Sequence, residues 1–397
     1  MDLAEVPLVL CLAGLAAYTV LGGADFGAGL WFAITRRREQ ELREQTLHAM
    51  APVWEANHVW LIFVLVVCWT AYPVAFASIF STLAVPLLIA ALGVILRGTA
   101  YALRSGDPSP RQDSAIGLVF SFSSVLTPFA LGTTVGAIAA GRVPVGNAEG
   151  DQWTSWTGAT SLIVGVLAVA VSAYMAAVFL AADAARQGDE RMVAAFRRRA
   201  AIAGVVAGAL ALAGLAVLNG DAPELFDDLV EGAGLPAVIV SALAGAGTLV
   251  LVLRSRFEPA RYTAAVAVAA IIAGWGIAQS PDFLPGLTVD EAAADDATIV
   301  VLLAGLGVGA LVLVPSLVLL FMLVLRGRFD APAPAPVAPE SRPAGAPAIG
   351  APAALGAGGA LLLLVTHAAW LQLIGALAML MAAGTALPLL VMRDHDR

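Results

Sequence analysis

Residues 18–31 read YTVLGGADFGAGLW, an apolar stretch that carries one aspartate and four glycines. The stretch lies inside a longer apolar segment, residues 8–34, which exceeds the about 20 residues that a helix needs to cross the hydrocarbon core of a bilayer. An ionisable side chain in such a segment is costly, and it usually faces the interior of a helix bundle or a water-filled cavity. Asp25 therefore predicts a polar site inside a membrane protein.

The composition of the whole chain is typical of a polytopic all-α membrane protein. Of its 397 residues, 60% are hydrophobic and 13% are charged, whereas soluble domains are about 45–50% apolar and about 25% charged. The net charge of -8 and the lack of a basic cluster of the nucleic-acid-binding type exclude nucleic acid as a partner. The chain has no phosphate-binding loop, nucleophile elbow or HExxH motif, so ATP-driven transport is not supported.

Nine apolar segments are predicted to cross the membrane as helices. Arginines gather in the connections after the odd-numbered segments, and the alternate connections are acidic or poor in arginine. By the positive-inside rule the N-terminus lies outside and the ninth segment ends in the cytoplasm. The first segment lacks a basic n-region, so we expect it to be retained as a span. The segments are 8–34, 53–75, 78–102, 114–140, 157–182, 200–218, 235–253, 262–279 and 297–325.

The sequence predicts three regions along the chain. Residues 1–330 contain the nine segments. Residues 331–354 are rich in proline and alanine and predict a semi-rigid extended linker. Residues 355–397 form an additional C-terminal membrane segment, apolar over about 361–392. One tilted span would place the C-terminal RDHDR outside and a tight hairpin would return it inside, and the sequence leaves both open.

The position of Asp25 along its segment predicts its depth. It lies eleven residues before Arg36, about 16 Å along a helix, and therefore in the cytoplasmic half. Gly23 and Gly27 have the small-xxx-small spacing that lets helices approach closely, and we interpret them as packing residues. For Asp25 we favour a functional role over a simple hydrogen bond to a neighbour.

The second segment opens with a polar cluster, APVWEANHVWLIF. Its carboxylate and imidazole are three residues apart and share a helix face. Acidic groups and histidines at a membrane entrance are typical of proton relays in pumps and oxidases. The alternatives are helix capping with packing for the cluster and an interfacial aromatic belt for the tryptophans. The residues are Glu55, Asn57 and His58, flanked by Trp54 and Trp60.

The same cluster contains residue types that can bind a metal or haem iron. A Glu-x-x-His pair is part of di-iron bundle motifs, but no second such pair precedes His48, His367 or His395. The two histidines nearest to spans, His58 and His367, are not on neighbouring helices in this scheme. We therefore expect no metal or haem ligand in this chain.

Two further features lie in the third and fourth segments. Arg97 and Arg104 end the third segment, and we expect both to extend to the cytoplasmic interface. The fourth segment, SFSSVLTPFALGTTVG, carries a hydroxyl-rich stripe around Pro128. We interpret the hydroxyls as partners for helix carbonyls near a proline kink, with a wet path as the alternative.

Four stretches of this sequence resemble subunit II of the cytochrome bd-type quinol oxidases. They are YTVLGGADFGAGLW, APVWEANHVWLIFVLVVCWTAYPVAFA, LRGTAYALRS and QSPDFLPGLTVDEAAADDATI, and the resemblance covers about residues 1–330. It implies nine transmembrane helices arranged as two four-helix bundles plus a peripheral helix, in the bacterial cytoplasmic (inner) membrane. It also implies a partner, subunit I, that holds two b-type haems, one d-type haem and the quinol site.

The resemblance further implies roles for residues of this chain. The complex would oxidise quinol and reduce oxygen to water with protons from the cytoplasm, and Asp25 and Glu55 match acidic positions of a proposed proton route. A structural quinone or a lipid is a further ligand, and small single-span accessory subunits are further partners. The C-terminal segment would be a fused equivalent of such a subunit or a peripheral anchoring helix.

The sequence also departs from the family pattern. Gly22 and Ala102 stand where acidic residues are common, and His58 stands where glutamine or glutamate is common. These departures predict either a rearranged proton route that uses His58 or a divergent paralogue with other cofactors. Two functions of other classes compete: a proton-coupled permease that uses Asp25 and Glu55, and an assembly protein without proton chemistry.

Overall fold

The computed structural model describes residues 2–35, 54–104 and 110–325. The predicted linker and the predicted C-terminal membrane segment lie outside these residues. The chain divides into two compact units, residues 1–315 and 316–397, and the account below concerns the first unit except for the end of one helix.

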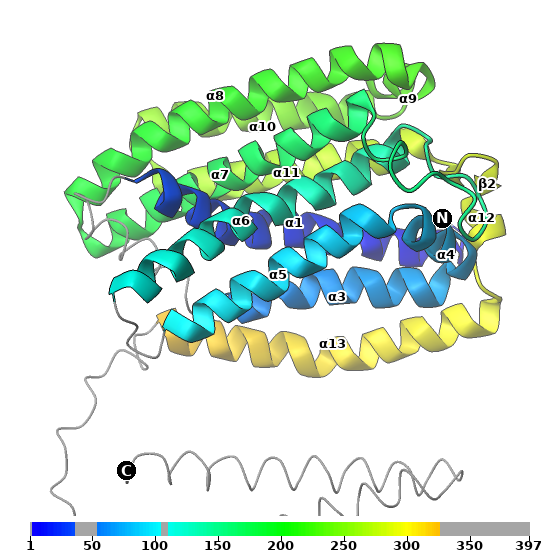
Figure 1. Ribbon diagram of the computed structural model, residues 1–397, viewed down its shortest axis with the longest axis horizontal. Helices are drawn as coiled ribbons and strands as arrows, with labels where there is room; N and C mark the ends of the chain where they lie inside the picture. The colour runs from blue at the N-terminus through cyan, green and yellow to red at the C-terminus, as the bar shows by residue number, and fades with distance from the viewer. Residues whose placement is uncertain (1, 36–53, 105–109, 326–397) are drawn as a thin grey trace, which may run out of the picture. The chain divides into compact units, whose positions relative to one another are not determined.

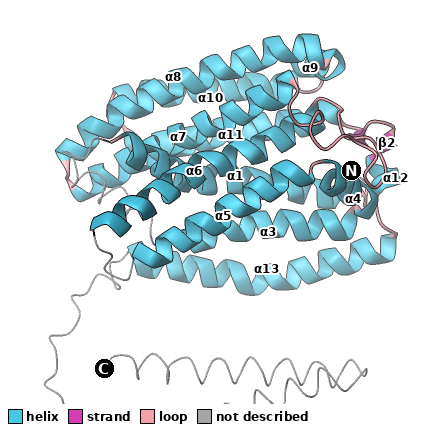
Figure 2. Cartoon of the chain, in the orientation of Figure 1, coloured by secondary structure: helices cyan, strands magenta, loops and turns pink. Residues whose placement is uncertain are grey.

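The described chain is almost entirely helical (Figures 1 and 2). Within the described residues, eight helices are long and apolar enough to cross a membrane, which confirms an all-α polytopic membrane protein. They are α1 (Glu5–Ile34), α5 (Ala84–Arg104), α6 (Pro110–Ala139), α7 (Ala159–Gln187), α8 (Glu190–Asp221), α10 (Leu235–Leu253), α11 (Phe257–Gln279) and α13 (Asp296–Leu325). Shorter helices are α3 (Trp54–Ala71), α4 (Pro73–Thr82), α9 (Pro223–Val230) and α12 (Val289–Ala292).

The second and third predicted segments are divided differently from the prediction. The chain breaks after α3 at Tyr72 (φ -134°, ψ 63°) and again at Leu83 (φ -101°, ψ 26°), so that α4 stands as a separate short helix. Pro73 explains the first break, because the residue before a proline is disfavoured in the helical region. The described side chains of α3 run from Asn57 to Ala71, which is shorter than a full membrane span. A ninth crossing of the membrane therefore remains a prediction.

α1 is the central helix of the first unit. It packs against α3, α6, α7 and α11, while α5 packs on α6, α8 on α7, and α10 on α11. The largest buried cluster joins α1, α7, α8 and α11 and is rich in alanine, with larger side chains such as Met175 and Phe196 between the small ones. Small residues let membrane helices approach closely, and dispersion contacts then hold them together.

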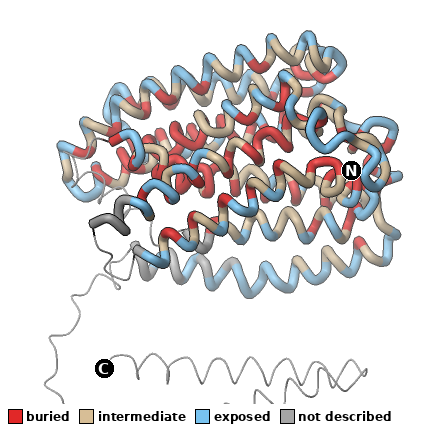
Figure 3. The backbone as a smooth tube through the Cα atoms, in the orientation of Figure 1, coloured by how far each residue is buried: buried red, intermediate tan, exposed pale blue. Residues whose placement is uncertain are grey.

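The outward faces of the helices remain apolar. Large side chains such as Leu212 on α8 (70% exposed) and Leu311 on α13 (76% exposed) have no protein cover, and buried residues concentrate between the helices (Figure 3). Such surfaces are unfavourable in water and suit the hydrocarbon of a bilayer.

A two-stranded antiparallel hairpin follows α11. It is formed by β1 (Asp282–Leu284) and β2 (Leu287–Thr288). Thr288 and Glu291 then form a reciprocal capping box that starts α12. The side-chain oxygens thereby satisfy backbone N–H groups that the short helix leaves without partners. The hairpin and α12 thus form an ordered connection to α13.

Candidate functional site

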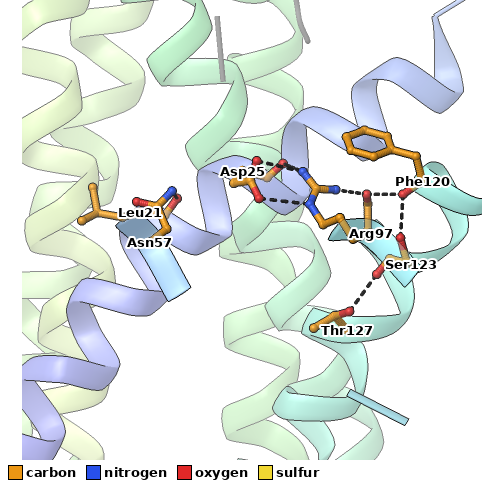
Figure 4. Close-up of polar contacts among 8 residues, drawn as sticks. Leu21, Asp25, Asn57, Arg97, Phe120, Ser123 and Thr127 are labelled. Carbon is orange, nitrogen blue, oxygen red and sulfur yellow. Dashed lines mark hydrogen bonds and ion pairs between the residues drawn. The ribbon is translucent and has the colours of Figure 1, made fainter. Parts of the chain in front are cut away.

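The centre of the candidate site is a buried ion pair between Asp25 of α1 and Arg97 of α5 (Figure 4). Arg97 Nε donates to Asp25 Oδ2 at 3.0 Å, and Arg97 Nη2 donates to Asp25 Oδ1 at 2.8 Å. Nη2 also donates to the backbone carbonyl of Asp25 at 2.8 Å. Asp25 is 2% exposed and Arg97 is 1% exposed. Both carboxylate oxygens therefore have a cationic partner in place of water, which a buried charge requires.

α6 completes the surroundings of the guanidinium. Arg97 Nη1 donates to the hydroxyl of Ser124, which in turn donates to the carbonyl of Phe120. The guanidinium carbon lies 4.2 Å from the ring centroid of Phe120 and 5.1 Å from that of Phe26. Aromatic faces attract a cation, and they do so more strongly where water is excluded. One arginine therefore joins α1, α5 and α6.

The prediction that Arg97 extends to the cytoplasmic interface is wrong. Its side chain turns into the bundle because Asp25 offers a carboxylate there, and a buried carboxylate without a partner would cost several kcal/mol. Arg104 ends α5, and its side chain lies outside the described residues.

α3 brings two of the predicted polar residues next to α1. Asn57 is 3% exposed, and its Nδ2 donates to the carbonyl of Leu21 at 3.1 Å, one helical turn before Asp25. The ring of His58 packs edge-to-face against Tyr18 and Phe26, with both centroid distances 6.1 Å.

The neighbours of these two residues are less fully described. Trp60 contacts Phe63, with ring centroids 6.3 Å apart. Trp54 and Glu55 belong to α3, but their side chains lie outside the described residues. The structure thus places Asn57 and His58 beside α1 and leaves the position of the Glu55 carboxylate open.

The glycines of α1 differ in what they do. A Cβ on Gly27 would lie 1.9 Å from the carbonyl oxygen of Ser172 in α7, so the two backbones are in direct contact there. A Cβ on Gly29 would lie 2.0 Å from the hydroxyl of Ser124 and 2.8 Å from Arg97 Nη1. A Cβ on Gly23 would find ordinary contacts at 3.6 Å or more. Gly27 therefore allows the α1–α7 contact, and Gly29 leaves room for the guanidinium.

The hydroxyl stripe of α6 bonds mainly to its own helix. Ser123 donates to the carbonyl of Phe120 at 3.0 Å, and Thr127 donates to the carbonyl of Ser123 at 2.9 Å (Figure 4). These hydroxyls therefore bond to carbonyls of their own helix, and their role at a kink around Pro128 stays a prediction. The sequence did not single out Ser124 or Phe120 as partners of Arg97, and the only signal was the hydroxyl-rich sequence itself.

An apolar cavity of about 340 Å³ adjoins the site. Its lining comes mainly from α1, α3, α4, α6, α7 and α11 and includes Tyr18, Phe26 and Gln279. Among the described residues, no group of three or more His, Cys, Asp or Glu side chains is placed to hold a metal ion.

Comparison with known proteins agrees with this architecture. The family model for cytochrome bd terminal oxidase subunit II matches residues 3–324. The bd oxidase structure from Geobacillus thermodenitrificans shares the fold, with a TM-score of 0.70 and 24% sequence identity over 82% of this chain and 99% of that chain.

Curated relatives match over shorter stretches. Cytochrome bd ubiquinol oxidase subunit 2 of Bacillus subtilis is 28% identical over 131 residues, which are 33% of this chain and 38% of that protein. Cytochrome bd-I ubiquinol oxidase subunit 2 of Escherichia coli is 25% identical over 127 residues, or 32% and 33% of the two chains. The matched stretches thus span less than two fifths of these relatives. Because the family model covers well over half of the chain, the chain belongs to the cytochrome bd terminal oxidase subunit II family.

Proposed function

We propose that this chain is the haem-free subunit of a membrane complex that oxidises quinol and reduces oxygen to water. It would pair with a haem-bearing subunit I, support assembly of that complex and conduct protons from the cytoplasm. Family membership supports the oxidase over a permease, and the observation that carries the proton role is the buried Asp25–Arg97 pair in the helix core.

The packing of the helices and the distribution of arginines support the following proposed arrangement in the membrane. α1, α3, α5 and α6 form one four-helix bundle, α7, α8, α10 and α11 form the second, and α13 is peripheral. The arginine-rich connections place the N-terminus outside. Asp25 then lies in the cytoplasmic half, on the side from which protons for water formation are taken.

The two carboxylates have unequal roles in this proposal. Both oxygens of Asp25 accept hydrogen bonds from Arg97, so this carboxylate serves as the counter-charge of the buried guanidinium. Glu55 precedes Asn57, which is bonded to α1 beside the pair. In this proposal Glu55 exchanges protons at the cytoplasmic entrance of the proton route. The route then passes the Asp25–Arg97 ion pair. His58 supplies an imidazole one helical turn beyond Glu55.

The haems belong to the partner in this proposal. When bound there, they supply electron transfer and oxygen reduction. Within the described residues His58 is the single histidine, and its ring packs against Tyr18 and Phe26. This packing fits a buried or proton-exchanging side chain better than an axial haem ligand. The contribution of this chain is then to exclude water, hold charge and move protons.

The test compares Glu55→Gln with Asp25→Asn in the purified complex. Glu55→Gln should lower oxygen consumption per haem by about 10²-fold or more, the usual contribution of a positioned acid–base group, while subunit association stays as in the wild type. Asp25→Asn should lower both turnover and the yield of complex, because it leaves Arg97 buried without its counter-charge.

Glu224→Gln, in the connection between α8 and α10, is the matched control for removal of one carboxylate, and it should leave both readouts unchanged. Wild-type turnover in the Glu55→Gln complex would refute the proton role. Loss of assembly with normal turnover in the assembled fraction would show a scaffold role instead.

A further inference from the structure

Four exposed arginines lie where α8 begins and α10 passes into α11. Arg197 and Arg198 are on α8, and Arg254 and Arg256 flank the turn between α10 and α11. Arg197 Nη1 donates to the hydroxyl of Ser255 at 3.3 Å, which ties the two segments together. These ends of the helices lie at the same end of the unit (Figure 1).

These arginines differ from the others at the same end. Arg186 and Arg261 are neutralised by ion pairs with Asp183 and Glu258. Within the part of the chain that the structure describes, Arg198, Arg254 and Arg256 form no ion pair, and the bond of Arg197 is to a hydroxyl. Among the described residues, these four positive charges therefore share one surface without an acidic side chain paired to them.

The described acidic residues of the neighbouring segments form no ion pair with these four arginines. Asp189 accepts the backbone N–H of Met192 as the N-cap of α8. Glu190 is exposed in the first turn of α8. Glu258 is bonded to Arg186 and Arg261.

An apolar surface continues from the arginines along the same helices. On α8, Ile202 (52% exposed) and Val205 (60% exposed) follow Arg198 at helical spacing, and on α10 Val250 and Leu253 are exposed beside Arg254. α8 and α10 are in contact at this level, since a Cβ on Gly204 would meet the side chain of Leu249. Cationic groups at the end of a lipid-facing apolar surface match the two parts of a phospholipid.

We propose that Arg197, Arg198, Arg254 and Arg256 bind the headgroup of an anionic phospholipid of the cytoplasmic leaflet, whose acyl chains lie along α8 and α10. Guanidinium groups bind phosphate oxygens in pairs of hydrogen bonds, and basic sites between helices on the cytoplasmic side suit a headgroup with two phosphates. Cardiolipin is the lipid that carries such a headgroup, and it is the occupant to which the proposal commits.

The test measures bound lipid on the intact complex by native mass spectrometry, with tetraoleoyl cardiolipin as the probe and dioleoyl phosphatidylcholine as the zwitterionic comparison. The quadruple variant R197Q/R198Q/R254Q/R256Q should bind cardiolipin at least about tenfold more weakly than the wild type. The quadruple lysine variant, which keeps the charge and loses the paired hydrogen bonds, should fall between them. The single variant R254Q, which puts folding at less risk, should also bind cardiolipin more weakly than the wild type.

The matched control is R104Q/R111Q/R326Q/R328Q, which removes four arginines from other connections of the same predicted side. It should retain wild-type binding. Equal cardiolipin binding by the wild type and the quadruple glutamine variant would overturn the proposal, as would an equal loss in the control. Displacement of cardiolipin by millimolar inorganic phosphate would also overturn it, because the site would then recognise free phosphate and not a lipid.

Discussion

Arg97 and Asp25 are 72 residues apart in the sequence and form a two-point ion pair, with Nε 3.0 Å from Oδ2 and Nη2 2.8 Å from Oδ1. Neither side chain reaches solvent. A pair of this kind tolerates the loss of both charges better than the loss of one, because a single remaining charge stays buried without compensation. The pair therefore ties the stability of the helix core to the candidate proton route.

Arg97→Gln should destabilise the protein by about 3–5 kcal/mol, because the Asp25 carboxylate loses its counter-charge. The double variant Asp25→Asn/Arg97→Gln should recover part of this loss. Thermal unfolding of the purified complex in one detergent measures both. Arg104→Gln, at the end of the same helix, serves as the control for charge removal. Equal stability of the single and double variants would contradict the coupling.

Gly27→Ala should weaken the contact between α1 and α7. The added methyl would lie 1.9 Å from the Ser172 carbonyl oxygen, and backbone shifts of this kind cost about 1–3 kcal/mol. Gly23→Ala is the matched control, since its methyl would find ordinary contacts with the same residue of α7. The yield and thermal stability of the two variants compare the positions directly. Equal behaviour of the two variants would show that α1 and α7 are not in backbone contact at Gly27.

Gly29→Ala should disturb Arg97 more than Ser124→Ala does. A methyl at Gly29 would overlap the Ser124 hydroxyl and crowd the guanidinium, whereas Ser124→Ala removes one hydrogen bond worth about 1.5–3 kcal/mol to a charged group. Thermal unfolding ranks the two variants. If the double variant Gly29→Ala/Ser124→Ala were as stable as Ser124→Ala alone, crowding of the Ser124 hydroxyl would explain the whole defect, and the contact with Arg97 would be immaterial.

The capping box of α12 should make its loop sensitive to acid. Hydrogen bonds from the Thr288 backbone N–H and hydroxyl lower the pKa of Glu291 below its model-compound value of 4.5. A lowered pKa in the folded state means that the stabilisation is complete above about pH 4.5 and is lost as the pH falls through the lowered value. Hydrogen exchange of residues 282–295, corrected for intrinsic rates, should show less protection at low pH.

Glu291→Gln is the control for that pH effect. It should reduce protection of the same residues at neutral pH and remove most of its dependence on acid. A loop whose protection falls with pH equally in the wild type and in Glu291→Gln would show that another group controls it.

Much of the fold could be predicted from sequence because lipid imposes a simple requirement. A helix that crosses a bilayer needs a long apolar run, and eight of the nine predicted segments correspond to helices of that kind. The helix bounds differ from the prediction between 53 and 102, where the chain breaks at Tyr72, before Pro73, and again at Leu83. The apolar character of the flanking residues is the same on both sides of the break, so hydropathy alone does not locate it.

The sequence by itself determined that the chain is a helical membrane protein with a costly carboxylate at Asp25, because hydropathy and charge act residue by residue. Only the tertiary structure decided which group neutralises that carboxylate. Arg97 has a long side chain that can reach either the interface or the helix core, and its direction depends on Asp25, Ser124 and Phe120, which come from two other helices. Such a choice rests on contacts between distant segments, which no local pattern records.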